Sequence, residues 1–138
     1  MARILIVDDD EVMAELVSEL LSQNGHMVSA VHKGNEAVSA AIASAPDLLI
    51  LDYELPDRSG LDILRALREM PAFVDLPIMM LTGKRGRLLS VRAEHDGIDE
   101  YLTKPFDPED LVTRVETMLN NVTVLRSASR VATPSLRY

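Results

Sequence analysis

The chain has 138 residues, of which 47% are hydrophobic, and a formal net charge of −8, so it can bury a core of its own and is not a disordered protein. It has no cysteine, which excludes a disulfide framework, a cysteine-bound zinc and a thiol nucleophile. No apolar run approaches the ~20 residues that span a bilayer and the first residues do not form a signal peptide, so we expect a cytoplasmic chain without a membrane partner. The acidic balance argues against direct nucleic-acid binding, which needs clustered Lys and Arg.

The C-terminal residues differ from the rest in charge. Residues 122–138 contain three arginines and no acidic residue, and subtracting their +3 from the total of −8 leaves −11 on residues 1–121. We therefore expect one domain over residues 1–121, followed by a basic linker or tail over residues 122–138.

The first half of the chain predicts two strand–helix units. Residues 3–7 form a β-branched run that is too short for a buried helix and predicts a buried strand. Apolar residues from Val12 to Leu21 recur at helical spacing, and an Asn-Gly pair ends that helix. A second strand over 27–31 leads into a second helical pattern over 37–45, which a proline stops.

The second half of the chain predicts three more units. Strands are expected at 47–51, 78–81 and 99–103. The helix after the first of these strands starts at Leu61, and the next covers about 87–96 and has few apolar positions. The last helix begins with an acidic first turn at 107–110, and its expected buried face extends to Leu119. This alternation indicates an α/β fold, a doubly wound five-stranded parallel sheet whose functional crevice lies at the carboxyl ends of the strands.

Polar residues stand directly after the expected strands. They are Asp8, Asp9 and Asp10 after the first strand, Asp52 after the third, Thr82 after the fourth and Lys104 after the fifth. Carboxylates from two strands repel one another in a small space, so we expect a hard cation between them, and Mg²⁺ suits oxygen ligands of this kind. Lys104 and the Thr82 hydroxyl can meet anionic oxygens, so the set predicts a phosphoryl group carried on Asp52.

Each of these residues taken singly has an ordinary structural explanation. Asp10 suits a helix N-cap, Asp52 suits a turn, and Lys104 before a proline suits the end of a strand. Their joint occurrence, each after the right strand, favours the phosphoryl site.

These motifs resemble those of the receiver domain of bacterial response regulators, over about residues 3–120. The matching segments are Ile4-Leu5-Ile6-Val7-Asp8-Asp9-Asp10, Asp47-Leu48-Leu49-Ile50-Leu51-Asp52, Leu55-Pro56, Gly60, Leu81-Thr82-Gly83 and Tyr101-Leu102-Thr103-Lys104-Pro105-Phe106. The resemblance implies a flavodoxin-like sheet with strand order 2-1-3-4-5, built from five βα repeats.

The resemblance also implies roles for individual residues. Asp52 matches the phosphoacceptor and a metal ligand. Asp9 matches the direct Mg²⁺ ligand, Asp8 matches the acid that binds Mg²⁺ through water, and the backbone carbonyl of Glu54 matches a further ligand. The phosphoryl-binding groups match Lys104, Thr82 and Gly83, and the switch pair matches Thr82 and Tyr101. Asp10 falls one position beyond the acid pair and receives no such role.

By resemblance, the chain accepts its phosphoryl group from a sensor histidine kinase or a histidine phosphotransfer protein and then switches a protein-contact surface. It is not expected to be an enzyme beyond its own phosphorylation and dephosphorylation. The output would be a linked domain or a downstream protein, and a homodimer would use the fourth helix, the fifth strand and the fifth helix. Two alternatives stay open: a Mg²⁺-dependent hydrolase with Asp52 as nucleophile, which usually has a second Asp where Glu54 stands, and a docking-only receiver.

Two further residues are expected to modulate the site. In the family, the positions two after the phosphoacceptor and two after the switch Thr flank the path of attacking water, and here they are Glu54 and Lys84. Because their charges are opposite, we expect them to roof the acyl phosphate partly; the alternative is that both point into solvent.

The remaining polar and sulfur-containing residues are expected to be structural. His26, His32 and His95 are too scattered for a metal site, and we expect exposed or capping side chains away from the strand ends. Met27 is among the methionines expected in the core.

Overall fold

A five-stranded parallel sheet forms the centre of the molecule. The computed structural model describes residues 1–83 and 97–132, with side chains described up to residue 121. The strands are β1 (Arg3–Val7), β2 (Met27–Val31), β3 (Leu48–Asp52), β4 (Ile78–Thr82) and β5 (Glu100–Thr103). They lie in the order β2-β1-β3-β4-β5 and each neighbouring pair is parallel, as the sequence predicted.

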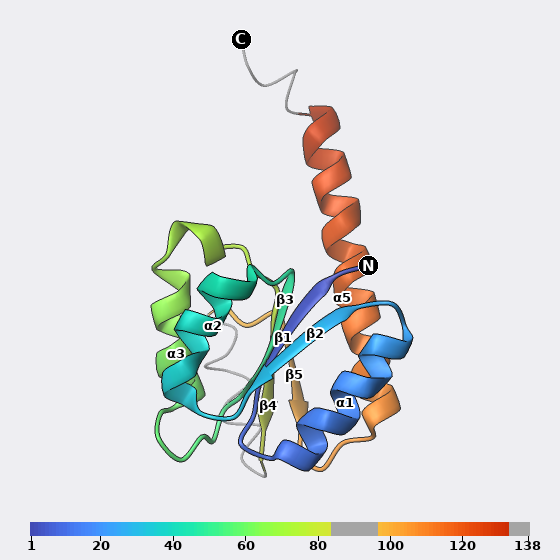
Figure 1. Cartoon of the computed structure of the whole chain (residues 1–138). Coiled ribbons are helices and arrows are strands. Elements are labelled where there is room, and N and C mark those ends of the chain that lie inside the picture. Colours follow the sequence, from blue (N-terminus) through green and yellow to red (C-terminus); the bar gives the residue numbers. More distant parts are fainter. Residues whose placement is uncertain (84–96, 133–138) are drawn as a thin grey trace.

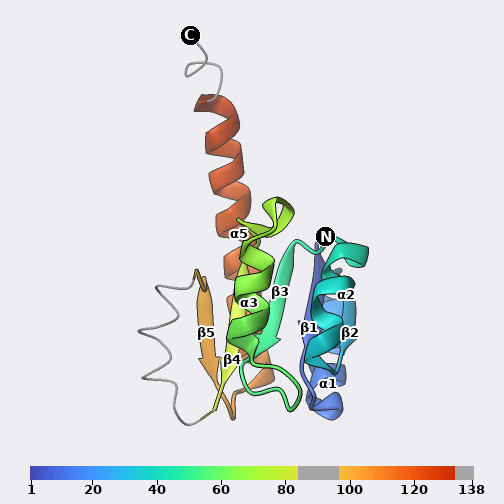
Figure 2. The same cartoon turned by 90° about the vertical axis from the view of Figure 1, so that its left-hand side faces the viewer.

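Helices cover both faces of the sheet (Figures 1 and 2). They are α1 (Glu11–Gln23), α2 (Ala37–Ser44), α3 (Gly60–Arg68) and α5 (Pro108–Ala132), with short 3₁₀ turns at Gly34–Glu36 and Pro71–Phe73. Helices α1 and α5 lie on one face, and α2 and α3 lie on the other. The helix expected at about 87–96 lies outside the described residues.

Alternate residues of the central strands enter two separate cores. In β1, Leu5 and Val7 pack towards α2 and α3, whereas Ile4 and Ile6 pack towards α1 and α5. All four side chains are at most 2% exposed. A strand buried on both faces needs apolar residues at every position, which is why β1, β3 and β4 appear in the sequence as continuous hydrophobic runs.

The buried face of α1 is narrower than its apolar residues suggested. Ala14, Val17 and Leu21 are buried, whereas Val12 is 80% exposed and Leu16 is 41% exposed. All five are apolar, but only residues spaced three and four apart on one side of a helix can face the same sheet. Only one side of the apolar series of this helix therefore enters the core.

Two residues at the start of β2 also differ from expectation. Met27 is 54% exposed because β2 is an edge strand, so it does not belong to the core. His26 is not an exposed residue, since its side chain is only 7% exposed. Its Nδ1 accepts a hydrogen bond from the Ala2 N–H at 3.0 Å, and its Nε2 pairs with Glu116 on α5.

Helix α5 is longer than the sequence indicated. It spans 25 residues and ends at Ala132, well past Leu119, the last residue of the expected buried face, and its C-terminal half extends beyond the sheet (Figure 1). Secondary structure therefore does not break at residue 121, where we expected the domain to end. None of the helices within the described ranges is both long and apolar enough to cross a membrane.

Candidate functional site

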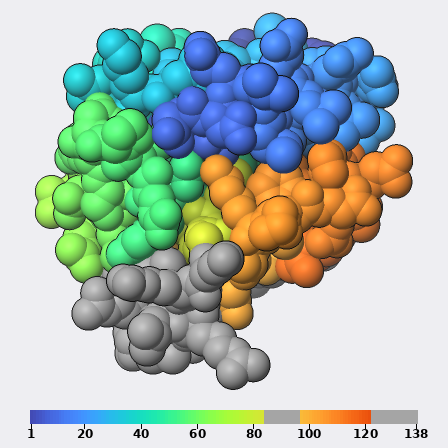
Figure 3. All heavy atoms as spheres, turned by 90° about the horizontal axis from the view of Figure 1, so that it is seen from below, coloured from blue at the N-terminus to red at the C-terminus, as the bar shows by residue number. Residues whose placement is uncertain are grey.

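The predicted site residues meet at the carboxyl ends of the strands. Figure 3 views the molecule from this end, where segments from the N-terminal, middle and C-terminal parts of the chain surround a recess with the end of β4 at its bottom. Three residues at this edge are polar and yet buried: Asp8, Asp52 and Thr82 are 1%, 4% and 1% exposed. Buried charges require partners, so their contacts define the chemistry of the site.

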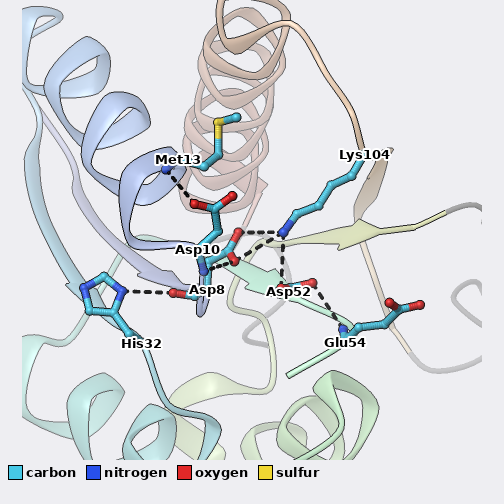
Figure 4. Close-up of polar contacts among 7 residues, drawn as sticks. All are labelled: Asp8, Asp10, Met13, His32, Asp52, Glu54 and Lys104. Atoms are coloured by element: carbon cyan, nitrogen blue, oxygen red, sulfur yellow. Dashed lines mark hydrogen bonds and ion pairs between the residues drawn. The ribbon is translucent and has the colours of Figure 1, made fainter. Parts of the chain in front are cut away.

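Asp8 is held at the end of β1 by its backbone and its side chain (Figure 4). Its Oδ1 accepts a hydrogen bond from the Asp10 N–H at 3.0 Å, and its N–H donates to the Val31 carbonyl of β2 at 3.2 Å. Asp10 itself turns away and caps α1, because its side chain accepts from the Met13 N–H at 3.1 Å. The N-cap explanation of Asp10 is thus confirmed, and Asp8 is the acid that faces the site.

Asp52 is placed by a tight turn behind the end of β3. Its Oδ1 accepts a hydrogen bond from the Glu54 N–H at 3.2 Å. The chain then returns so closely that a Cβ on Gly60 would lie 2.5 Å from the Asp52 carbonyl oxygen and 2.8 Å from the Tyr53 Cα. Real Cβ atoms do not approach backbone atoms this closely, so α3 can begin directly behind Asp52 only with a glycine at position 60.

Lys104 joins the two buried acids. Its Nζ lies 3.0 Å from Asp8 Oδ2 and 3.2 Å from Asp52 Oδ2. The acids come from β1 and β3, and the lysine follows β5, so this one ammonium group links three strands of the sheet (Figure 4). Its side chain is 28% exposed, which leaves it accessible to a ligand.

Thr82 ends β4 with an unsatisfied hydroxyl. Its Oγ1 is buried and has no hydrogen-bond partner within the described part of the chain. A buried hydroxyl without a partner is costly, so this atom is available for an oxygen supplied by a ligand. Next to it, Gly83 has no side chain, and a Cβ there would lie 3.4 Å from Glu54 Oε1, so the Glu54 carboxylate lies over Gly83.

Tyr101 lies on β5, beside the strand that carries Thr82. Its side chain is 39% exposed and borders a hollow of about 440 Å³ between β5 and the start of α5, lined also by Phe106 and Arg114. It is therefore on the surface in this structure. Lys84, the expected partner of Glu54, lies outside the described residues.

Burial and the neighbouring Asp8 both disfavour the ionised form of Asp52. Burial, followed by the charge of Asp8, raises the pKa of Asp52 from 3.8 to about 7, even though Lys104 acts to lower it. For Lys104, burial alone would lower the pKa, but the hydrogen bond to Asp8 and the charges of both carboxylates outweigh it and raise that pKa above its ordinary value. One cation thus only partly offsets the charge of two buried carboxylates, so a second cation at this site would be favourable.

The acid cluster has the donor atoms of a site for a hard cation. Carboxylate oxygens of Asp8, Asp9 and Asp52 lie within 4.8 Å of one another. All three are oxygen donors, which hard divalent cations prefer. Within this cluster, burial and then the charge of Asp8 raise the pKa of Asp52, and a further positive charge would oppose that shift. These residues therefore have the ligand chemistry to hold a metal ion.

One residue at this edge was not expected there. His32 follows β2, and its Nδ1 lies 2.9 Å from the backbone carbonyl oxygen of Asp8 (Figure 4). The expectation that His32 lies away from the strand ends is therefore wrong. The signal was in the sequence, since His32 comes directly after a predicted strand, but its partner is a backbone atom that no residue motif reveals.

The raised pKa of Asp52 predicts how metal-free stability depends on pH. The folded state holds a proton on Asp52 up to about pH 7, whereas the unfolded state releases it near 3.8, so stability conferred by this group is present below pH 3.8 and is lost as pH rises towards 7. With chelator present, the free energy of unfolding of the wild type should fall relative to that of Asp52→Asn by on the order of 1–4 kcal/mol between those pH values. Urea denaturation at each pH measures the difference, and parallel pH profiles for the two proteins would contradict it.

The chain matches a described protein family and several curated relatives. The family model of the response regulator receiver domain matches residues 4–116. The chain is 38% identical over 136 residues to the probable transcriptional regulatory protein TcrX of Mycobacterium tuberculosis, covering 96% of this chain and 57% of that one. It is 39% identical to the DNA-binding response regulator MtrA of Mycobacterium leprae, covering 85% and 51%. The chain thus spans about half the length of these relatives.

Solved structures show the same architecture. The chemotaxis protein CheY4 of Vibrio cholerae superposes with a TM-score of 0.80 at 30% identity, covering 86% of this chain and 98% of that one. A response regulator receiver domain protein from Clostridium thermocellum gives a TM-score of 0.81 at 27% identity, covering 91% and 99%. With the five-stranded order and the buried acids, these matches lead to one conclusion: the chain belongs to the response regulator receiver domain family, whose members are phosphorylation-based signalling switches.

Proposed function

We propose that this receiver accepts a phosphoryl group on Asp52, that Mg²⁺ supports the transfer, and that a sensor histidine kinase or a histidine phosphotransfer protein is the donor. The observation that carries the proposal is the buried Asp52 carboxylate, held by the Glu54 N–H and by Lys104 beside a second buried acid. Such a carboxylate suits nucleophilic attack on phosphorus because its neighbours fix its position next to a positive charge.

The residues of the site divide the work of the transfer. An Asp52 oxygen attacks phosphorus, the P–O bond forms as the P–N bond of the donor histidine breaks, and the electron pair of that bond stays on the imidazole nitrogen. Lys104, now 3.2 Å from Asp52, neutralises charge on the phosphoryl oxygens, and the free Thr82 hydroxyl donates to another. Beyond this transfer and the hydrolysis of the resulting acyl phosphate, we assign the chain no enzymatic reaction.

Mg²⁺ would be held by Asp8, Asp9, Asp52 and the backbone carbonyl of Glu54. When bound, it supplies positive charge to the phosphoryl oxygens and to the acid cluster. The raised pKa of Asp52 supports this assignment, because a partly protonated Asp52 is a weak nucleophile until a cation stabilises its ionised form.

The partners follow from the same proposal. The kinase or phosphotransfer protein would reach the chain in the cytoplasm, and the phosphorylated state would act on a linked output domain or on a downstream protein. This chain covers only 57% and 51% of the two regulatory proteins named above, which supports an output module beyond the receiver. The exposed Tyr101 and the hollow beside α5 support a contact surface there. We propose that a homodimer would use this surface together with the helix expected at about 87–96.

The first prediction concerns the phosphoacceptor. Incubation with acetyl phosphate and Mg²⁺ should add one phosphoryl group to the wild type and none to Asp52→Asn, because the amide cannot attack phosphorus. Intact-protein mass spectrometry measures the addition. Asp62→Asn, at an exposed position on α3, is the matched control and should react like the wild type, whereas modification of Asp52→Asn would overturn the assignment.

The second prediction concerns the switch. We propose that Thr82 turns towards the phosphoryl group and that Tyr101 then moves inward into the vacated space, which shifts the population between two states. The Thr82 hydroxyl, which has no hydrogen-bond partner among the described residues, and the exposed Tyr101 side chain support this coupling. Beryllofluoride with Mg²⁺ should shift the amide NMR signals of residues 100–103 in the wild type.

Thr82→Val is the control for this coupling, since it keeps the side-chain shape and removes the hydroxyl. In that variant the signals around Asp52 should still respond to beryllofluoride, while those around Tyr101 should not. A response around Tyr101 that is equal in both proteins would show that the Thr82 hydroxyl does not transmit the switch.

The third prediction concerns the lifetime of the phosphoryl group. We propose that Glu54 and Lys84 partly roof the acyl phosphate, and the Glu54 carboxylate over Gly83 supports its half of the roof. Glu54→Ala and Lys84→Ala should each speed dephosphorylation by removing a side chain from the path of water, and the double variant should be non-additive. Glu19→Ala, exposed on α1, serves as the control; additive or unchanged rates would remove the pair from the mechanism.

A further inference from the structure

His32 makes a hydrogen bond whose direction is fixed by chemistry. Its Nδ1 lies 2.9 Å from the carbonyl oxygen of Asp8, and a carbonyl oxygen can only accept. The proton of the neutral ring must therefore be on Nδ1. The other ring nitrogen, Nε2, lies 3.8 Å from Glu11 Oε1, beyond hydrogen-bond distance, so the contact to Asp8 is the ring's principal polar interaction among the described residues.

The accepting oxygen belongs to the peptide group that joins Asp8 to Asp9. On the other side of Asp8, its N–H donates to the Val31 carbonyl at 3.2 Å. Consecutive residues at the end of β2, Val31 and His32, therefore hold both peptide groups that flank Asp8. The plane of the second peptide sets the direction in which the chain leaves Asp8, and with it the direction of the next side chain.

The two acids differ in what else holds them. The Asp8 side chain is buried and is fixed by Lys104 and by the Asp10 N–H. Asp9 is exposed, and within residues 1–83 and 97–121 its carboxylate has no hydrogen bond or ion pair. One of its carboxylate oxygens lies within 4.8 Å of carboxylate oxygens of Asp8 and Asp52. This orientation of the Asp9 side chain therefore depends on the backbone that precedes it.

We propose that His32 is a positioning residue for the metal site: by fixing the Asp8–Asp9 peptide, it aims the Asp9 carboxylate at the cation. This inference rests on the proposed Mg²⁺ site and adds to it the residue that directly follows β2. Partners that orient metal ligands without touching the metal commonly change its affinity by about 10–100-fold when they are removed.

The test compares Mg²⁺ affinity in two substitutions of similar size. His32→Asn places an N–H donor where Nδ1 stands and should bind Mg²⁺ within about twofold of the wild type, whereas His32→Leu removes the donor and should bind about tenfold more weakly. Amide NMR titration of the folded proteins with MgCl₂ gives the dissociation constants. Equal affinity of the leucine variant and the wild type would overturn the inference, as would equal weakening in both variants.

His26→Leu separates positioning from simple loss of stability. This histidine is more buried than His32 and makes hydrogen bonds of its own to Ala2 and Glu116, so its replacement should lower the melting temperature and leave the Mg²⁺ affinity of the folded protein unchanged. A loss of affinity in His26→Leu equal to that in His32→Leu would assign both effects to stability and overturn the positioning role.

One measurement needs neither a variant nor a metal. In the metal-free wild type at pH 8, the ring ¹⁵N signals of His32 should show the proton on Nδ1; a proton on Nε2 would overturn the inference. The outcomes for the two proposals are distinguishable. A wild type that does not bind Mg²⁺ rejects the proposed site, whereas a wild type and a His32→Leu variant that bind equally well reject only the role of His32.

Discussion

The site depends on a shortage of positive charge at one edge of the sheet. Two buried carboxylates, from Asp8 and Asp52, share one ammonium group from Lys104, with Nζ–O distances of 3.0 and 3.2 Å. Because burial and mutual repulsion oppose ionisation, the pKa of Asp52 rises to about 7. A fold that only had to be stable would avoid this arrangement, and the proposed cation and phosphoryl group would offset it.

The surrounding structure keeps this unfavourable arrangement in place. Two apolar cores clamp the central strands from both faces, so that the ends of β1 and β3 cannot move apart to relieve the repulsion. Gly60 lets α3 begin directly behind Asp52, and the Asp10 cap starts α1 immediately after the acid pair. Stability generated in the apolar layers thus holds the polar edge in a strained electrostatic state.

The sequence predicted the parts of this structure that depend on local pattern. Continuous apolar runs identified the central strands, and the positions of Asp8, Asp52, Thr82 and Lys104 after those strands placed them on one edge, because parallel strands share a direction. It could not predict which apolar residues face the sheet: Val12 and Leu16 have the spacing of a buried helix face, but they lie on the exposed side of α1. That choice depends on how the helix is rotated against the sheet, which is a tertiary property.

The histidines show a second kind of limit to sequence reasoning. His26 and His32 follow no recognisable motif, because each contacts a backbone atom, at Ala2 N and Asp8 O, and any residue can supply such an atom. The length of α5 was hidden for a different reason: the charge of residues 122–132 indicated a basic tail, although these residues continue the helix. Contacts to the backbone and helices beyond the core both escape an analysis based on side-chain pattern.

The continuous α5 gives the domain a mechanical arm. A helix of 25 residues is about 37 Å long, and its first turn stands beside β5, next to the hollow that Tyr101 borders. A tilt of about 10° at that end would carry the far end about 6 Å sideways if the helix stays rigid. The same helix that closes one face of the sheet would then act as a lever, turning a small rearrangement at the domain's edge into a much larger displacement outside it.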